Sequence, residues 1–304
     1  NGGGLYADHQ LVGKVWDVKA ARYIDQTGFN ERITNAEYLL LGELHDNPVH
    51  HQNQARIIRQ LASAGREASV AFEMIDRQQG KRLAAETTTS VDELIDSLNK
   101  SETGWDYENQ YKTVFAATLA AGFRVDAANL NRNELMGLVT QGEENLPENY
   151  RSMLERTPLT PQLLADLSSE IKRSHCDLLD QDTAEKMALA QRVRDASLAS
   201  SLLQSDKPVK VLVAGIGHVR NDRGVPPYLK NNSKTPVTDE NILVVGMIQV
   251  EEGLDAAADY AEAWGVDRLP FDVVMFTPAV MQVDHCAELK KPSPKRGFQF
   301  GFSI

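Results

Sequence analysis

Six short runs of apolar residues recur along the chain and are rich in β-branched and aliphatic side chains. They cover residues 38–41, 68–72, 123–128, 209–214, 242–248 and 271–276. Nearly continuous apolar character over a few residues is typical of strands in a parallel sheet that is covered on both faces. Residues 14–24 mix β-branched and polar side chains, which predicts an edge strand or a hairpin.

Helical patterns separate these runs. Residues 48–64 form one, with Asn47 as the expected N-cap and Pro48 at the first helical position. Residues 108–121 form another, which Gly122 is expected to end. The alternation of strands and helices predicts an α/β fold with a mostly parallel sheet flanked by helices, and residues 1–304 are expected to form a single domain.

Residues 132–206 interrupt this rhythm, because they show helical patterns and no candidate strand. We interpret this segment as a helical insert set apart from the sheet. It is expected to contain a long helix over about 181–203, with loops at 141–149 and 157–161.

Charge changes the picture by excluding one class of partner. The formal net charge is −11, so a nucleic-acid partner is not expected. The basic residues Lys290, Lys291, Lys295 and Arg296 lie among prolines and predict a solvated loop. No apolar run is long enough to predict a membrane-spanning helix.

The chain start and the cysteines leave alternatives open. Residues 1–4 read Asn-Gly-Gly-Gly, a flexible leader that follows either a removed signal sequence or an arbitrary boundary. The two cysteines, Cys176 and Cys286, lie in no C-x-x-C pair. They are able to form one bridge in an oxidising compartment.

Polar residues follow four of the predicted strands. They are Glu43 and His45, Glu73, Asn129 and His218. Ligands of open parallel sheets bind at the carboxyl ends of the strands, so these side chains are expected to meet in one crevice.

The helix over 48–64 adds three polar residues to this edge. His50, His51 and Gln54 fall on its apolar face within the first two turns. They either line the pocket or satisfy nearby backbone groups. Gly42, Gly215 and Gly217 lack side chains, which allows a ligand or a neighbouring chain to approach closely.

This residue set fits metal chemistry. Two histidines, His45 and His218, with one or both of the carboxylates Glu43 and Glu73 are able to hold Zn²⁺ or Mn²⁺, and a further carboxylate is then able to act as a general base for a metal-bound water. No H-E-x-x-H motif, P-loop or nucleophile elbow accompanies them. A dinucleotide site is not expected, because the 215–217 turn lacks the third glycine.

These residues also carry a family resemblance. Leu41-Gly42-Glu43-Leu44-His45-Asp46-Asn47-Pro48, Ala71-Phe72-Glu73-Met74, Gly104-Trp105-Asp106, Ala127-Ala128-Asn129-Leu130 and Val213-Ala214-Gly215-Ile216-Gly217-His218-Val219-Arg220 resemble the ChaN-like haem-binding uptake family. The resemblance spans about 40–229. The family is related to the Tiki proteases and to erythromycin-esterase-like hydrolases, which share two Gly-x-x-His motifs, here Gly42 to His45 and Gly215 to His218.

The resemblance implies a haem-binding lipoprotein of the bacterial outer membrane, anchored only by lipid, that works with haem-uptake machinery. It also implies a homodimer that holds two haems face to face, each iron ligated by a tyrosine. Tyr150, the only tyrosine of the insert, is our candidate ligand, with His175 second and Lys172 for a propionate. Arg220 is expected at the pocket with His50, His51, Gln54 and Asn129.

Two functional hypotheses therefore stand. The first is haem binding without catalysis, on a surface formed partly by the insert. The second is a metal-dependent hydrolase, protease- or esterase-like, with Glu43, His45, Glu73 and His218 as its catalytic residues. Whether the protein is an enzyme is left open by the sequence.

Overall fold

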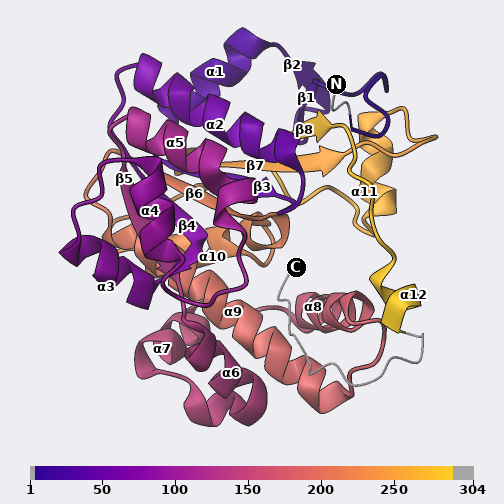
Figure 1. Cartoon of the computed structure of the whole chain (residues 1–304). Helices are drawn as coiled ribbons and strands as arrows, with labels where there is room; N and C mark the ends of the chain where they lie inside the picture. The colour runs from indigo at the N-terminus through magenta and orange to yellow at the C-terminus, as the bar shows by residue number, and fades with distance from the viewer. Residues whose placement is uncertain (1–3, 290–304) are drawn as a thin grey trace.

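The computed structural model describes residues 4–289, which are built around one eight-stranded sheet (Figure 1). The strand order is β2-β1-β8-β7-β3-β6-β4-β5. The six strands from β8 to β5 are parallel, and β1 pairs antiparallel with both β8 and β2. The strands are β1 (Val15–Asp17), β2 (Arg22–Ile24), β3 (Tyr38–Glu43), β4 (Ala68–Asp76), β5 (Arg124–Asn129), β6 (Val209–Gly215), β7 (Ile242–Gln249) and β8 (Val273–Thr277).

The predicted fold class is confirmed. Each of the six apolar runs contains or overlaps a parallel strand, and residues 14–24 form the edge hairpin of β1 and β2. Alternate residues of a strand point to opposite faces. Leu39 and Leu41 of β3 therefore lie in one core cluster, whereas Leu40 lies in the other.

Helices cover both faces of the sheet (Figure 1). The core cluster that contains Leu39 and Leu41, here called the first, packs under four helices. They are α1 (Gln26–Asn35), α2 (Pro48–Ser63), α4 (Val91–Leu98) and α5 (Lys112–Ala120). Asn47 caps α2 as predicted, since its side chain accepts a hydrogen bond from the Val49 amide. The second cluster packs under α9 (Gln181–Gln204) and α10 (Val225–Asn232). α3 (Arg77–Ala85) contacts β5 at the end of the sheet.

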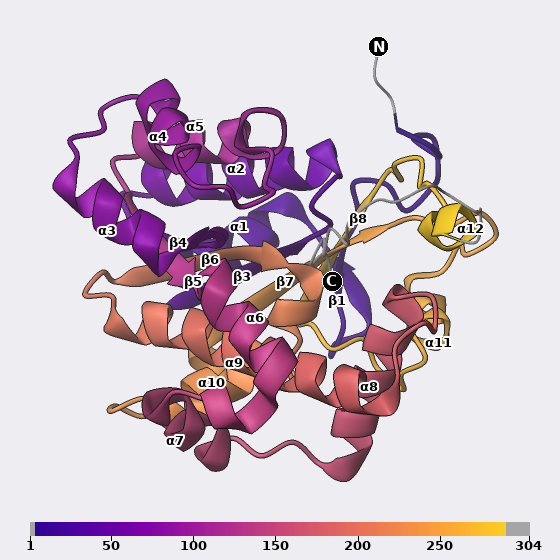
Figure 2. The same ribbon diagram turned by 60° about the horizontal axis from the view of Figure 1, so that its bottom comes forward.

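The segment over 132–206 is helical as predicted, but it is not set apart from the sheet. α9 packs directly on β4, β5 and β6. Most residues in the middle of this helix are themselves buried, so the helix is covered on nearly every side. The other helices of the segment pack on α9, away from the sheet (Figure 2). They are α6 (Arg132–Gln141), α7 (Glu148–Arg156) and α8 (Pro161–Ser174).

The C-terminal part of the described chain is tied to the insert. Cys176, just beyond α8, forms a disulfide with Cys286 of α12 (His285–Leu289). Figures 1 and 2 both show α8 and α12 on the same side of the molecule. None of the helices within residues 4–289 has the length and apolar character needed to cross a membrane. The predicted basic loop from Lys290 to Arg296 lies outside the described residues.

Candidate functional site

The carboxyl end of β3 holds three interacting side chains. Glu43 is fully buried, and its Oε2 accepts a hydrogen bond of 3.0 Å from the Tyr111 hydroxyl. His45 Nδ1 lies 3.2 Å from the same carboxylate oxygen and 2.9 Å from the Tyr111 oxygen. Tyr111 ends a single π-helical turn over Tyr107–Tyr111, a distortion that often occurs at functional sites.

The ionisation of this group follows from its contacts. Burial opposes the charged form of Glu43, but the charge of His51 and the hydrogen bond from His45 outweigh it and lower the pKa of Glu43. Burial likewise opposes the charged form of His45, whose pKa is raised by Glu43 and Glu73. His45 Nε2 is buried and has no hydrogen-bond partner among the described residues, and its ring meets that of Trp105 edge-on.

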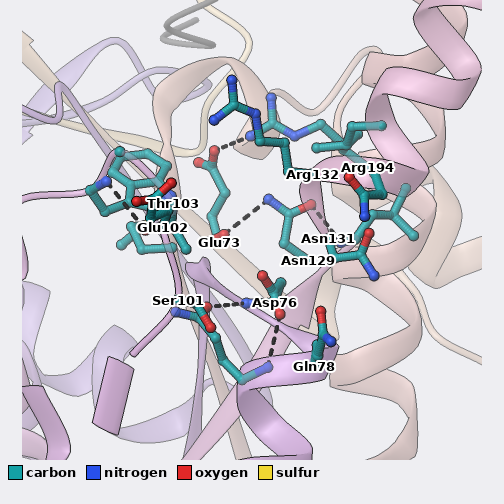
Figure 3. A pocket seen from close by; sticks show the side chains of 17 residues that line it. Glu73, Asp76, Gln78, Ser101, Glu102, Thr103, Asn129, Asn131, Arg132 and Arg194 are labelled. Carbon is teal, nitrogen blue, oxygen red and sulfur yellow. Dashed lines mark hydrogen bonds and ion pairs between the residues drawn. The ribbon is translucent and has the colours of Figure 1, made fainter. Parts of the chain in front are cut away.

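The ends of β4 and β6 hold a second group centred on Glu73. Its Oε1 accepts a 2.8 Å hydrogen bond from the Gly215 amide, and its Oε2 forms an ion pair with Arg194 of α9. His218 Nε2 lies 3.5 Å from Glu73 Oε2, and His218 Nδ1 lies 2.6 Å from Asp195 Oδ1. Figure 3 shows the Glu73 carboxylate facing Arg194, while the backbone carbonyl of Glu73 accepts a hydrogen bond from Asn129 Nδ2.

The charges of this second group reinforce one another. Despite burial, His218 and Arg194 hold the pKa of Glu73 well below its ordinary value. Burial and Arg194 oppose protonation of His218, but Glu73 and Asp195 raise the pKa of His218 to about 9. Glu73 and His218 therefore carry opposite charges near neutral pH, whereas burial raises the pKa of Asp195.

The predicted convergence is present in this geometry. Glu43, His45, Glu73 and His218 form a continuous chain, since His45 Nε2 lies 3.9 Å from Glu73 Oε1. The metal prediction gains no support, because no set of three or more His, Cys, Asp or Glu side chains among residues 4–289 is arranged to hold a metal ion. Protein hydrogen bonds already engage both carboxylates and His218 Nδ1.

A cleft of about 600 Å³ opens next to Glu73 (Figure 3). Its walls come from the loop before the π-helical turn, the ends of β4 and β5, the start of α3, α6 and α9. Met74, Trp105, Leu130 and Leu135 supply apolar surface, while charged and amide side chains supply the polar part. Its polar lining residues include Glu73, Asp76, Glu102, Asn129, Arg132 and Arg194.

Of the residues predicted to line the pocket, Asn129 does so and four others do not. His50 is a structural residue: Nδ1 accepts from the Leu44 amide at 2.9 Å, and Nε2 lies 2.8 Å from Thr277 Oγ1. Burial lowers the pKa of His50 to about 3, so it is neutral. His51 and Gln54 instead contact the Glu43 carboxylate. His51 Nε2 lies 3.6 Å from Glu43 Oε2, and Gln54 Nε2 donates a hydrogen bond to Glu43 Oε1. Arg220 is paired with Asp222.

Sequence reasoning missed Arg194 and Asp195, because it treated their helix as separate from the sheet. Both are nearly fully buried. The available signal was a charged pair within a stretch of α9 that is otherwise mostly small and apolar, from Ala188 to Ala199. Buried charges of this kind require partners. Tyr111 was also missed, and nothing in its sequence context indicates its role.

The candidate haem ligands of the insert have different surroundings. Tyr150 is only 3% exposed, its hydroxyl has no hydrogen-bond partner among the described residues, and the Arg77 guanidinium lies 5.4 Å from its ring centre. His175 is half-buried at the end of α8, and its Nδ1 lies 2.8 Å from the Ile171 carbonyl oxygen. Lys172 donates to the side chain of Gln181, which joins α8 to α9.

His175 borders a small recess beside the cleft. The recess is lined by Leu135, Ile171, His175, Met187, Ala190, Gln191 and Arg194. Leu135 and Arg194 line both hollows, so the recess and the cleft adjoin. The recess has a volume of only about 20 Å³ and places His175 next to the α6 and α9 wall of the cleft.

Comparison with known structures supports the fold. The ChaN protein of Campylobacter jejuni, described by its cofacial heme binding, has a TM-score of 0.67 and 21% sequence identity, covering 86% of this chain and 95% of that one. A mutant of the erythromycin esterase EreC has a TM-score of 0.48 at 12% identity, covering 86% of this chain and 96% of that one. No curated protein sequence matches this chain.

A family model matches most of the chain. The model is described as haem-binding uptake, Tiki superfamily, ChaN, and it matches residues 29–229. This range contains the two Gly-x-x-His motifs, the Glu73 strand and the whole helical insert. The chain therefore belongs to the ChaN family of haem-binding uptake proteins in the Tiki superfamily.

Proposed function

We propose that this protein binds ferric haem on the surface formed by the cleft and the recess, with His175 as the axial ligand. Family membership supports haem as the ligand. The lining fits a flat apolar molecule with two carboxylates, because it combines Met74, Leu130 and Leu135 with the exposed Arg132. Bound haem supplies an iron that takes an axial donor from the protein.

The observation that carries the proposal is the state of the His175 ring. A carbonyl oxygen only accepts, so the short contact to Ile171 places a proton on Nδ1. In the neutral ring this leaves a lone pair on Nε2. Metal-bound histidines are commonly oriented in this way by a backbone carbonyl. Tyr150 is the family-implied alternative, but its buried hydroxyl has to be uncovered before iron reaches it.

A hemin titration of the purified protein tests the proposal. Saturable change in the haem absorbance band supports it, and its absence overturns it. Loss of that change in His175→Ala identifies the ligand, whereas loss in Tyr150→Phe alone assigns the iron to Tyr150.

The remaining elements of the proposal concern the cell. We propose a bacterial outer-membrane lipoprotein, held by a lipid anchor, that dimerises on haem binding and passes haem to uptake machinery. The Cys176–Cys286 disulfide supports an oxidising compartment. Cell fractionation with lipid labelling tests the anchor. Sedimentation of the protein with and without hemin tests the dimer.

A second candidate function is hydrolysis, which one observation favours. His45 Nε2 has no hydrogen-bond partner among the described residues, while Nδ1 is held by Glu43 and Tyr111. A histidine held in this way is able to transfer a proton at Nε2. Turnover of a panel of esters and peptides that is lost in Glu43→Gln and in His45→Ala supports this function. Absence of turnover by the wild type overturns it.

A further inference from the structure

The turn after α8 has an unusual residue at its key position. The Asp177 amide donates to the Lys172 carbonyl at 2.8 Å, and the Cys176 amide donates to the Arg173 carbonyl at 3.0 Å. These two bonds define a Schellman turn, in which the residue after the C-cap adopts a left-handed backbone and is usually glycine. Here that residue is Cys176, with φ +59°, and Asp177 follows with φ +56°. Residues other than glycine rarely adopt this backbone conformation.

A disulfide ties the residue in this conformation to a distant part of the chain. It joins Cys176 to Cys286, which lies 110 residues away in sequence and on a different helix. Both cysteines are half-buried, so a small thiol reaches the bond. The turn is thus linked covalently to another segment of the chain. A glycine at the same position would adopt the left-handed backbone without such a link.

The same turn positions His175. His175 is the C-cap residue of α8, directly before Cys176, and its amide donates to the Ile171 and Lys172 carbonyls. Its ring is oriented by the contact of Nδ1 with the Ile171 oxygen. If the turn unwinds, the backbone of His175 and the direction of its Nε2 change with it.

We propose that the Cys176–Cys286 disulfide is a redox-sensitive clamp that positions His175, so that reduction lowers the affinity for haem. This inference rests on the proposed haem function. The reductant is a dithiol: its two S–H bonds are replaced by one S–S bond, and two electrons and two protons pass to the protein disulfide, giving two thiols. Cys176 and Cys286 act only through the turn and touch no ligand.

The test compares hemin affinity in four forms of the full chain. These are the oxidised protein, the reduced protein freed of reductant, Cys176→Ser/Cys286→Ser, and Cys176→Gly/Cys286→Ser. We expect the reduced protein and the double-serine variant to bind about tenfold more weakly than the oxidised protein. The glycine variant is expected to recover most of this loss, because glycine adopts the left-handed turn without a tether. Equal affinity in all four forms overturns the clamp.

Hydrogen exchange of the Asp177 amide gives a readout that does not depend on haem. We expect slow exchange in the oxidised protein and in the glycine variant, and fast exchange in the reduced and double-serine forms. Unchanged far-UV circular dichroism shows that the fold itself persists. If the oxidised protein binds no hemin, the proposed function fails. The exchange rates then test whether the disulfide stabilises the turn, and this role is overturned if reduction leaves the rates unchanged.

Discussion

Asp195 of α9 and His218 after β6 form a buried ion pair, with Oδ1 and Nδ1 2.6 Å apart. The pair joins the helical segment to the carboxyl edge of the sheet. Both side chains are nearly inaccessible to solvent. Buried away from water, His218 therefore depends on Asp195 and Glu73 for its counter-charges.

Replacing one member of this pair should strongly destabilise the fold. Asp195→Asn removes one of the two counter-charges of buried His218 and leaves only Glu73 opposite Arg194, and breaking a buried pair costs roughly 3–5 kcal/mol. Chemical denaturation measures the loss in the free energy of unfolding. The matched control is Asp182→Asn on the same helix, which removes an exposed ion pair with Lys186 and should change little. Equal effects of the two substitutions would contradict the structural role of the pair.

Stability should fall as the pH rises from neutral to alkaline. The pKa of His218 is raised from 6.5 to about 9 in the folded protein. Its contribution is thus fully present below pH 6.5 and is lost as the pH rises through 9. A shift of this size corresponds to on the order of 3 kcal/mol. Denaturation at pH 6.5, 7.5 and 9 measures the slope, and His218→Gln should reduce it. A wild-type stability that stays flat over this range would refute the assignment.

The haem ligand should be revealed by two substitutions in the insert. His175→Ala removes the lone pair at Nε2 and is expected to weaken hemin binding by at least about tenfold. Tyr150→Phe removes a buried hydroxyl that has no described partner, so it should leave both the fold and the haem spectrum unchanged. Absorbance titrations and thermal unfolding measure both effects. The opposite result, with loss only in Tyr150→Phe, assigns the iron to the tyrosine.

Gly42 should tolerate no side chain, because a Cβ there would lie 2.4 Å from Val219 Cγ2 and 3.1 Å from Ile216 Cα. Gly42→Ala forces β3 and the segment after β6 apart, and overpacking of this kind costs roughly 1–3 kcal/mol. Gly217→Ala is the control, since a Cβ at that position meets nothing within 4 Å. Chemical denaturation compares the two variants. If both lose the same stability, close packing at Gly42 is not the cause.

The pattern of apolar and polar residues was enough to predict the sheet and one edge of the site. Runs such as 38–41 or 209–214 are nearly continuous in apolar character, which is typical of strands in a parallel sheet covered on both faces. Because parallel strands end at the same edge, the positions of Glu43, Glu73 and His218 after these runs were enough to predict that they meet. The family motifs of the same segments were confirmed over 29–229.

The partners of these residues, in contrast, follow from packing between distant segments of the chain. The crossover helix α9 comes from far along the chain, and its packing against β4–β6 brings Arg194 to Glu73 and Asp195 to His218. No local pattern predicts which residues of α9 face Glu73 and His218, because this depends on how a helix buried on nearly all sides packs on the sheet. The structure likewise decided that Cys176 meets Cys286, that Tyr150 is covered, and that His175 is left at the edge of the recess. Contacts between residues so distant in sequence are fixed by three-dimensional packing, which hydrophobic periodicity does not encode.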